Sequence, residues 1–191
     1  MRKQELLSLI RPALVTKHYL PGDAALATPS AVLIIIHYHG GGDTPYVFLT
    51  KRSSTVRSHK GEISFPGGRY VESDIEFLTT ALRETEEEIG IRISQEQIVG
   101  SLRAVRTLTS NHFIVPFVTV QDKLPEHKIA AREVEAVIDA PLIDTLKSIA
   151  PDIEHYGLAK DAFRFTYGCH VIWGATARML KQLYDLLIRP S

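Results

Sequence analysis

Runs of apolar residues predict several strands, the most pronounced of which is Ala31–His37. This run, AVLIIIH, is apolar at consecutive positions and rich in β-branched residues, as expected for a central strand covered on both faces. Gly40, Gly41 and Gly42 then break the chain before the run Tyr46–Lys51, which predicts a hairpin. The same criteria predict further strands at Ile98–Val105, Phe113–Val120, Glu133–Asp139 and Phe163–Tyr167.

Helical spacing of apolar residues predicts four helices. The first, Lys3–Ile10, is short and amphipathic, and Pro12 ends its pattern. The others are predicted at Asp74–Ile89, Leu142–Ile149 and Ala175–Ile188. Because strands and helices are interleaved, the predicted fold class is α/β or α+β with a mixed sheet.

Composition restricts the class of protein. The chain has 191 residues, with no internal repeat and no linker-like stretch, so we expect a single domain over residues 1–191. Lys and Arg together number 22, as do Asp and Glu, so there is no overall positive field to attract nucleic acid. The hydrophobic share of 45% and the charged share of 23% are those of a globular protein.

The chain carries no predicted secretory or membrane signal. The N-terminal apolar run is interrupted by Glu5, Arg11 and Pro12, and no stretch approaches the roughly 20 apolar residues of a membrane span. A single cysteine, Cys169, excludes an intrachain disulfide. A cytoplasmic location without membrane partners is therefore expected.

The predicted helix Asp74–Ile89 carries the candidate chemistry. A capping box, Ser73–Glu76, predicts its start, and Gly90 predicts its end. The positions that recur at steps of three and four define its predicted core face, namely Ile75, Leu78, Leu82, Thr85 and Ile89. An acidic cluster lies about 140° from that stripe and consists of Glu84, Glu87 and Glu88.

These clustered carboxylates predict a cation site. Neighbouring like charges on a helix repel by about 0.2–0.5 kcal/mol per pair, and a divalent ion would turn the repulsion into coordination. All-oxygen ligands favour Mg²⁺ or Mn²⁺ over zinc. Arg83 can reach Glu87 one turn later and orient it, and the backbone of Gly67 and Gly68 can approach a ligand closely, with the Gly67 carbonyl facing the same metal. The alternative is a solvated acidic face.

The segment Gly68–Ile91 resembles the Nudix box, G-x5-E-x7-R-E-U-x-E-E-x-G-U, where U is aliphatic. Arg83–Ile91 matches its second half except at Thr85. Asp74 stands where glutamate is expected, and eight rather than seven residues separate it from Arg83. The glutamates remain in register, so the departure concerns only the role of Asp74.

An upstream motif resembles the coenzyme A pyrophosphatase branch of the Nudix hydrolases. Residues 52–68 match R-S-x3-R-x3-G-x3-F-P-G-G at every fixed position, and weaker likeness continues through Ile172–Ala177. The resemblance implies an α/β/α sandwich around a mixed sheet, frequent homodimers, and hydrolysis of coenzyme A or its thioesters to 3′,5′-ADP and 4′-phosphopantetheine or its acyl form. Arg52, Arg57 and Gly68 would then bind substrate.

The resemblance assigns the acidic residues as follows. Glu84, Glu87, Glu88 and the Gly67 carbonyl would hold Mg²⁺ or Mn²⁺, and Glu84, Glu87 and Arg83 would be catalytic. The general base stays open between Glu84 or Glu87 and a loop acid, for which the candidates are Glu126, Glu133 and Glu154.

Three alternative functions remain open. The chain could be a Nudix hydrolase of another substrate, such as ADP-ribose or a dinucleotide polyphosphate. It could also be a non-catalytic nucleotide sensor or a generic cation-binding domain.

A pair of histidines lies outside these motifs. His37 and His39 share one strand face and could bind metal, but two imidazoles without a third ligand are weak support for a site.

Overall fold

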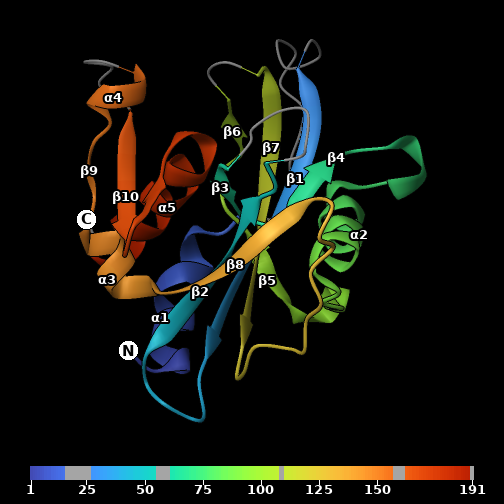
Figure 1. Cartoon of the computed structure of the whole chain (residues 1–191). Coiled ribbons are helices and arrows are strands. Elements are labelled where there is room, and N and C mark those ends of the chain that lie inside the picture. Colours follow the sequence, from blue (N-terminus) through green and yellow to red (C-terminus); the bar gives the residue numbers. More distant parts are fainter. Residues whose placement is uncertain (16–26, 55–60, 108–109, 157–161, 190–191) are drawn as a thin grey trace.

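The computed structural model describes residues 1–15, 27–54, 61–107, 110–156 and 162–189 (Figure 1). Its centre is a mixed sheet whose strands are β1 (Thr28–Tyr38), β2 (Pro45–Arg52), β3 (Ile63–Ser64), β4 (Gly67–Arg69), β5 (Ile98–Ser101), β6 (Val105–Arg106), β7 (His112–Gln121) and β8 (Val134–Pro141). A smaller sheet contains β9 (Ala150–Pro151), β10 (Phe163–Tyr167) and β11 (His170–Ile172).

Strand β1 organises the main sheet. It runs parallel to β7 along one edge, from the pair Thr28 and His112 to the pair His37 and Gln121. Its other edge is shared by two antiparallel partners, since β4 pairs with Ser30–Val32 and β2 with Ile35–Tyr38. The outer strand β8 pairs with β2. The hairpin predicted at the three glycines is therefore confirmed as β1–β2.

Helices cover both faces of this sheet. The described helices are α1 (Lys3–Ile10), α2 (Phe77–Ile89), α3 (Leu142–Lys147), α4 (Ile153–Tyr156) and α5 (Gly174–Leu187), with 3-10 turns η1 (Arg11–Ala13), η3 (Glu72–Asp74) and η4 (Gln95–Gln97). Helix α2 lies on one side of the sheet, and α1 and α5 lie on the other (Figure 1). This layering confirms the α/β/α sandwich and the mixed sheet.

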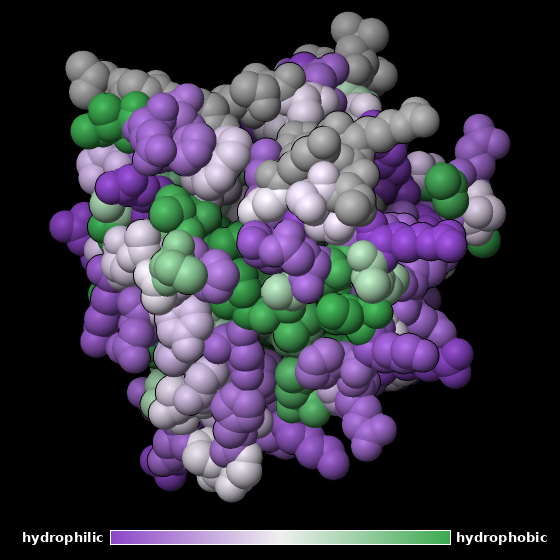
Figure 2. All heavy atoms as spheres, viewed as in Figure 1, coloured by the Kyte–Doolittle hydropathy of each residue, from purple (hydrophilic) through white to green (hydrophobic). Residues whose placement is uncertain are grey.

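The alternation of side chains along β1 creates two cores. Ala31, Leu33 and Ile35 point toward α2, where they pack with Ala81 and Ile89. The intervening side chains face the opposite core, which contains Ile34, Ile36, Leu6, Ile10, Leu180 and Leu183. The surface seen in Figure 2 is mostly polar, with a band of hydrophobic residues across its middle, over the region of β2 and β8. Among the described residues, no helix is both long and apolar enough to cross a membrane.

Several predicted elements are confirmed, and one splits. The bounds predicted for α1 and β10 agree with the structure, and those of β1, β2, β7, β8, α3 and α5 differ by a few residues. The predicted strand Ile98–Val105 instead forms two short strands, β5 and β6, which each pair antiparallel with β7 and are separated by residues 102–104.

The predicted start of α2 is wrong. The helix begins at Phe77 rather than Asp74, and the Ser73–Glu76 segment is not its capping box. Asp74 ends the turn η3, and Ile75 then adopts a φ of 65°, outside helical geometry. Asp74, predicted as the first residue of the helix, lies before it, and its carboxylate is bonded to Arg83 and Thr80.

The predicted core face of α2 is only partly correct. Thr85 and Ile89 are buried as predicted, but Ile75 is 87% exposed, and Ala81 and Glu88, which were not predicted, are buried as well. Small residues on this face let the helix pack closely against β1 and β4, and the Thr85 hydroxyl donates to the Ala81 carbonyl at 2.6 Å. Glu88 therefore lies on the packed face of the helix, contrary to the prediction.

Candidate functional site

The candidate site forms where α2 crosses the short strand β4. Val32 pairs with Gly67, and Ala31 pairs with Gly68. A Cβ atom on Gly67 would lie 2.3 Å from the Ala31 carbonyl oxygen, and one on Gly68 would lie 2.3 Å from the Glu84 carboxyl carbon. Glycine is required at position 67 because the backbone of β1 occupies the space of a side chain, whereas a side chain at position 68 would displace the Glu84 carboxylate.

Glu88 is the most buried of the three clustered glutamates of α2. Its residue is 4% exposed, and the Gly67 N–H donates to its Oε2 at 3.2 Å. Arg52 Nη1 lies 3.6 Å from Oε1. Burial raises the pKa of Glu88 to about 7, although the Gly67 hydrogen bond and the Arg52 charge oppose the shift. A cation beside this carboxylate would offset its desolvation.

Glu84 lies one turn earlier, against Gly68. Its side chain is 18% exposed, and its Oε1 accepts from Arg83 Nη1 at 2.8 Å. Burial raises the pKa of Glu84, a hydrogen bond from Arg83 lowers it, and the negative charges of Glu87 and Glu133 raise it further. Glu84 and Glu88 are thus two desolvated carboxylates on the side of α2 that meets the glycine strand.

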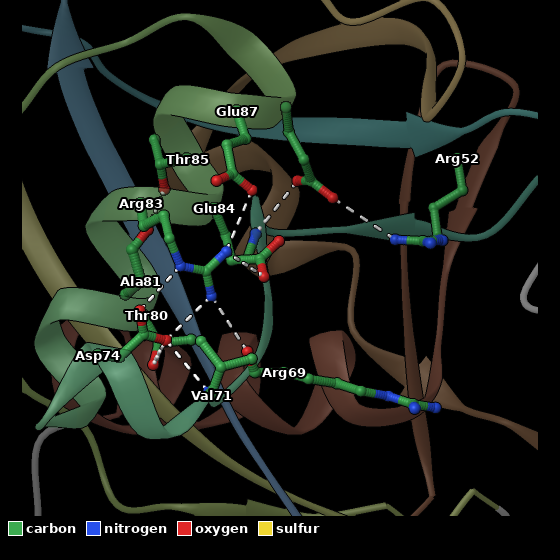
Figure 3. Close-up of polar contacts among 12 residues, drawn as sticks. Arg52, Arg69, Val71, Asp74, Thr80, Ala81, Arg83, Glu84, Thr85 and Glu87 are labelled. Atoms are coloured by element: carbon green, nitrogen blue, oxygen red, sulfur yellow. Dashed lines mark hydrogen bonds and ion pairs between the residues drawn. The ribbon is translucent and has the colours of Figure 1, made fainter.

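Arg83 orients the acids around it (Figure 3). Its Nη1 donates to Glu84 and, at 3.1 Å, to Oε2 of Glu87, which confirms the predicted contact one turn along the helix. Its Nη2 also donates to the Arg69 carbonyl at 3.2 Å, which ties the helix to β4. Glu87 differs from its neighbours because its side chain is 59% exposed.

Asp74 holds the other side of Arg83. Its Oδ1 accepts from Arg83 Nε at 2.9 Å, and its Oδ2 accepts from Arg83 Nη2, Thr80 Oγ1 and the Val71 N–H at 3.0, 2.8 and 3.2 Å. The hydrogen bond from Arg83 is the largest cause that lowers the pKa of Asp74 to about 2, against the effect of burial. The residue that departs from the box therefore positions the arginine.

The donor set fits a hard divalent ion. Carboxylates supply oxygen ligands only, and both Glu84 and Glu88 are buried acids whose pKa values are raised by burial. Such acids are stabilised in their ionised form by a nearby cation. The residues that would hold Mg²⁺ or Mn²⁺ are Glu84 and Glu88. The exposed Glu87 and the Gly67 carbonyl would supply additional oxygen ligands.

A cavity of about 420 Å³ opens beside these acids. Two of the predicted substrate residues, Arg52 and Gly68, line it, whereas Arg57 lies outside the described residues. Sequence reasoning missed other residues that line the cavity, among them Arg69, His112, Trp173 and Arg178. The likeness at Ile172–Ala177 was the available signal for Trp173.

Neighbouring groups fix the far wall of the cavity. The Trp173 ring stacks on His155 with centroids 4.0 Å apart and planes at 5°. Arg178 Nη1 donates to the Arg106 carbonyl at 2.6 Å. The cavity thus combines an anchored aromatic surface with cationic side chains, which suits a base joined to phosphates.

The structure also distinguishes among the loop acids. Glu133 raises the pKa of both Glu84 and Glu88 by its charge, so it lies close to the site. Glu154 instead lies 3.5 Å from Arg164 on β10. Of these two, Glu133 is the one that the fold brings near the acidic helix.

Comparison with known proteins identifies relatives. A family model described as the NUDIX domain matches residues 27–153. The chain is 34% identical over 143 residues to the uncharacterized Nudix hydrolase NudL of Photorhabdus laumondii, covering 73% of this chain and 75% of the relative. It is 33% identical over 143 residues to the protein of the same name from Escherichia fergusonii, covering 73% of each chain.

Solved structures share the fold. A MutT/nudix family protein from Enterococcus faecalis aligns with a TM-score of 0.59 at 14% identity, covering 99% of this chain and 69% of that one. The NUDIX domain of Shewanella oneidensis NrtR, solved with ADP ribose, aligns with a TM-score of 0.50 at 20% identity, covering 77% and 88%. At these identities the likeness concerns the fold alone.

Proposed function

This chain belongs to the Nudix hydrolase family, and we propose that it cleaves the diphosphate of coenzyme A or its thioesters. The products would be 3′,5′-ADP and 4′-phosphopantetheine or its acyl form. The observation that carries this proposal is the arginine-lined cavity beside Glu84 and Glu88. The motif at residues 52–68, which resembles the coenzyme A branch, supports the same substrate.

The charge of the cavity matches the charge of this substrate. Coenzyme A carries a diphosphate and a separate 3′-phosphate, so it needs cationic partners at more than one place. Arg52 lies at the acidic end of the cavity, 3.6 Å from Glu88, while Arg69 and Arg178 line other parts of its wall. We assign Arg52 to the diphosphate and the other two arginines to the remaining phosphate.

Diphosphate cleavage needs stabilisation of developing negative charge and an oriented water. Mg²⁺ or Mn²⁺ held by Glu84, Glu88, Glu87 and the Gly67 carbonyl would supply positive charge to a phosphoryl oxygen and lower the pKa of a bound water. Arg83 keeps Glu84 and Glu87 oriented through Nη1. Glu84, Glu87 and Glu133 are the candidates to accept the proton of the attacking water.

The test is a substrate panel with identification of products by mass. The purified protein is incubated with coenzyme A, acetyl-coenzyme A, ADP-ribose and a dinucleotide polyphosphate, each with Mg²⁺, Mn²⁺ or EDTA. Metal-dependent release of 3′,5′-ADP from coenzyme A is the expected result. Preferential cleavage of ADP-ribose, the ligand in the NrtR crystal structure, would replace the substrate and keep the mechanism.

A non-catalytic outcome is also distinguishable. Nucleotide binding without cleavage of any compound in the panel would contradict the proposal and indicate a sensor.

An Arg178→Ala variant tests the assignment of the 3′-phosphate contact. Loss of this contact should raise KM for coenzyme A by about tenfold or more and leave KM for dephospho-coenzyme A nearly unchanged. Equal effects on both compounds would contradict that assignment.

A further inference from the structure

Three potential metal ligands meet at the other end of β1, away from the acidic helix. His37 Nε2 lies 2.8 Å from Asp139 Oδ1, and His39 Nε2 lies 2.7 Å from Asp139 Oδ2. One ligand atom from each of the three residues lies within 4.8 Å of the other two. Within the part of the chain that the structure describes, this is the one group of three His, Cys, Asp or Glu residues that meets this criterion.

The strands themselves bring these residues together. His37 and His39 are two positions apart at the end of β1, so their side chains leave the same face of the sheet. Asp139 lies on β8, opposite Phe48 of β2, and reaches across β2 to both imidazoles. The carboxylate supplies the third ligand that the pair of histidines lacks in sequence, and it comes from about 100 residues away.

We propose that His37, His39 and Asp139 form a second metal site, which binds Zn²⁺ or a similar transition ion. Two imidazoles and one carboxylate are the donor set that such ions prefer, whereas Mg²⁺ prefers oxygen alone. The site is open to solvent on one side, because the His39 side chain is 54% exposed and that of Asp139 is 28% exposed. An ion there would keep at least one position for water or another ligand.

The surroundings of His37 indicate the strength of binding. Its side chain is fully buried, and its Nδ1 has no hydrogen-bond partner among the described residues. When Nε2 binds an ion, the ring proton lies on Nδ1. Metal-bound histidines ordinarily donate this N–H to a hydrogen-bond acceptor, which His37 lacks among the described residues. We therefore expect weaker binding than in a closed structural zinc site.

The site is separate from the acidic helix. His37 follows Val32, the partner of Gly67, by five positions, which corresponds to about 16 Å along a strand. Its donor atoms also differ in kind from those of Glu84 and Glu88. The two sites should therefore accept different ions, and each should still bind its ion when the ligands of the other are mutated.

The test is equilibrium dialysis of tag-free protein against Zn²⁺ in excess Mg²⁺, with bound zinc counted by mass spectrometry. A Cys169→Ser background removes the exposed thiol, which could itself bind zinc. The variants are His39→Ala and Asp139→Asn, which change an exposed ring and a carboxylate without altering backbone packing. Co²⁺ absorption in the visible range gives a second readout, because its d–d bands report the number and geometry of the ligands.

The expected result is one Zn²⁺ per chain, with affinity reduced at least about 100-fold in both variants. His127→Ala is the matched control, because its ring lies against Phe48 but outside the cluster. A Glu84→Gln/Glu88→Gln variant should retain zinc. Unchanged zinc binding in His39→Ala and Asp139→Asn, in proteins that unfold cooperatively, would overturn the proposal, as would loss of zinc from the Glu84→Gln/Glu88→Gln variant.

Discussion

Glu84, Glu87 and Glu88 occupy one turn of α2 but differ widely in exposure. Their side chains are 18%, 59% and 5% exposed. The buried members have raised pKa values because burial disfavours their charged forms. We infer that Glu84 and Glu88 contribute most to metal binding and that Glu87 has a weaker role.

Neutral substitutions of the buried glutamates should separate activity from stability. In Glu84→Gln and Glu88→Gln, turnover is expected to fall at least about 100-fold, because each loses a charged ligand. The free energy of unfolding of metal-free Glu88→Gln should stay the same or rise, because a buried charge is removed. Steady-state kinetics and urea unfolding provide the measurements.

Glu86→Gln is the control for these variants. Glu86 lies on the same helix turn, but it is exposed and pairs with Arg92 at 2.6 Å. Turnover by the Glu86→Gln variant should remain near that of the parent protein. Near-normal rates in both Glu84→Gln and Glu88→Gln would refute their assignment as metal ligands.

Gly68→Ala should disrupt the site through a single methyl group. The added Cβ would lie 2.3 Å from the Glu84 carboxyl carbon, so the carboxylate must move. We expect at least a tenfold loss of turnover, since small displacements of a positioned group are costly. Gly42→Ala, whose Cβ would meet only the His39 carbonyl at 3.2 Å in an exposed loop, is the control. Equal activity of the two variants would contradict the expected close packing.

At the scale of the element, α2 is held at its start by the Asp74 carboxylate rather than by its N-cap residue. The N-cap residue Glu76 makes no side-chain cap hydrogen bond, and Asp74, which lies in the turn before the helix, binds Thr80 and Arg83. The same contact orients Arg83 toward Glu84. Helix position and site geometry are therefore coupled through one buried carboxylate.

Asp74 should make stability depend on pH in the acidic range. Its folded pKa of about 2 is below the ordinary 3.8, so its contribution is complete above pH 3.8 and disappears as the pH falls through about 2. This shift corresponds to about 2 kcal/mol. In urea unfolding, Asp74→Asn should be less stable than the parent by about that amount at pH 7, and the difference should shrink toward pH 2.

Asp185→Asn provides the comparison for Asp74→Asn. Asp185 pairs with Lys181 one helical turn away, but its side chain is 47% exposed. Exposed ion pairs contribute about 0–1 kcal/mol, so this variant should be nearly neutral. A pH-independent difference between Asp74→Asn and the parent would show that the carboxylate charge is not responsible.

Helix α1 should contribute to stability through one face only. Leu6 is fully buried in the core beside α5, whereas Leu9 is 37% exposed. Leu6→Ala is expected to lower the free energy of unfolding by about 2–5 kcal/mol, and Leu9→Ala by about 0.5 kcal/mol or less. Urea unfolding of both variants measures the contrast, and similar losses would contradict the packing of α1.

Sequence predicts elements well where local signals decide them. The left-handed Gly90 ends α2 as expected, and the continuous apolar run of β1 places it at the centre of the sheet. Sequence fails where side-chain contacts outside the regular helix and strand repeats decide. The start of α2 depends on Asp74 and Arg83, and strands as short as β3 and β4 carry no periodicity.

The candidate site shows the same contrast between features that a local sequence pattern reveals and features that only the folded chain creates. The acidic residues and glycines lie within one short segment, Gly67–Glu88, so a motif reveals them. The cavity wall and Asp139 come from segments that meet only in the folded chain, and Glu88 is buried because it faces β4, against the helical pattern of apolar residues. A hydrophobic pattern cannot predict burial of a charged side chain.

For the whole molecule, the metal should be needed for turnover but not for folding. Hydrophobic cores on both faces of the sheet hold the described structure together, and the acidic residues lie at the side of one of them. EDTA is expected to abolish turnover while the circular dichroism spectrum remains native, and added Mg²⁺ should restore activity and raise Tm with concentration. Loss of the native spectrum in EDTA would contradict this expectation.

The parallel pairing of β1 with β7 has a consequence for how the protein is synthesised. Residues 28–37 find this partner only at residues 112–121, so the central pair cannot close until most of the Nudix region has left the ribosome. Contacts so distant in sequence slow folding because a long loop must be ordered first. Until then β1 lacks its parallel partner, and an unpaired apolar strand edge favours association with other chains.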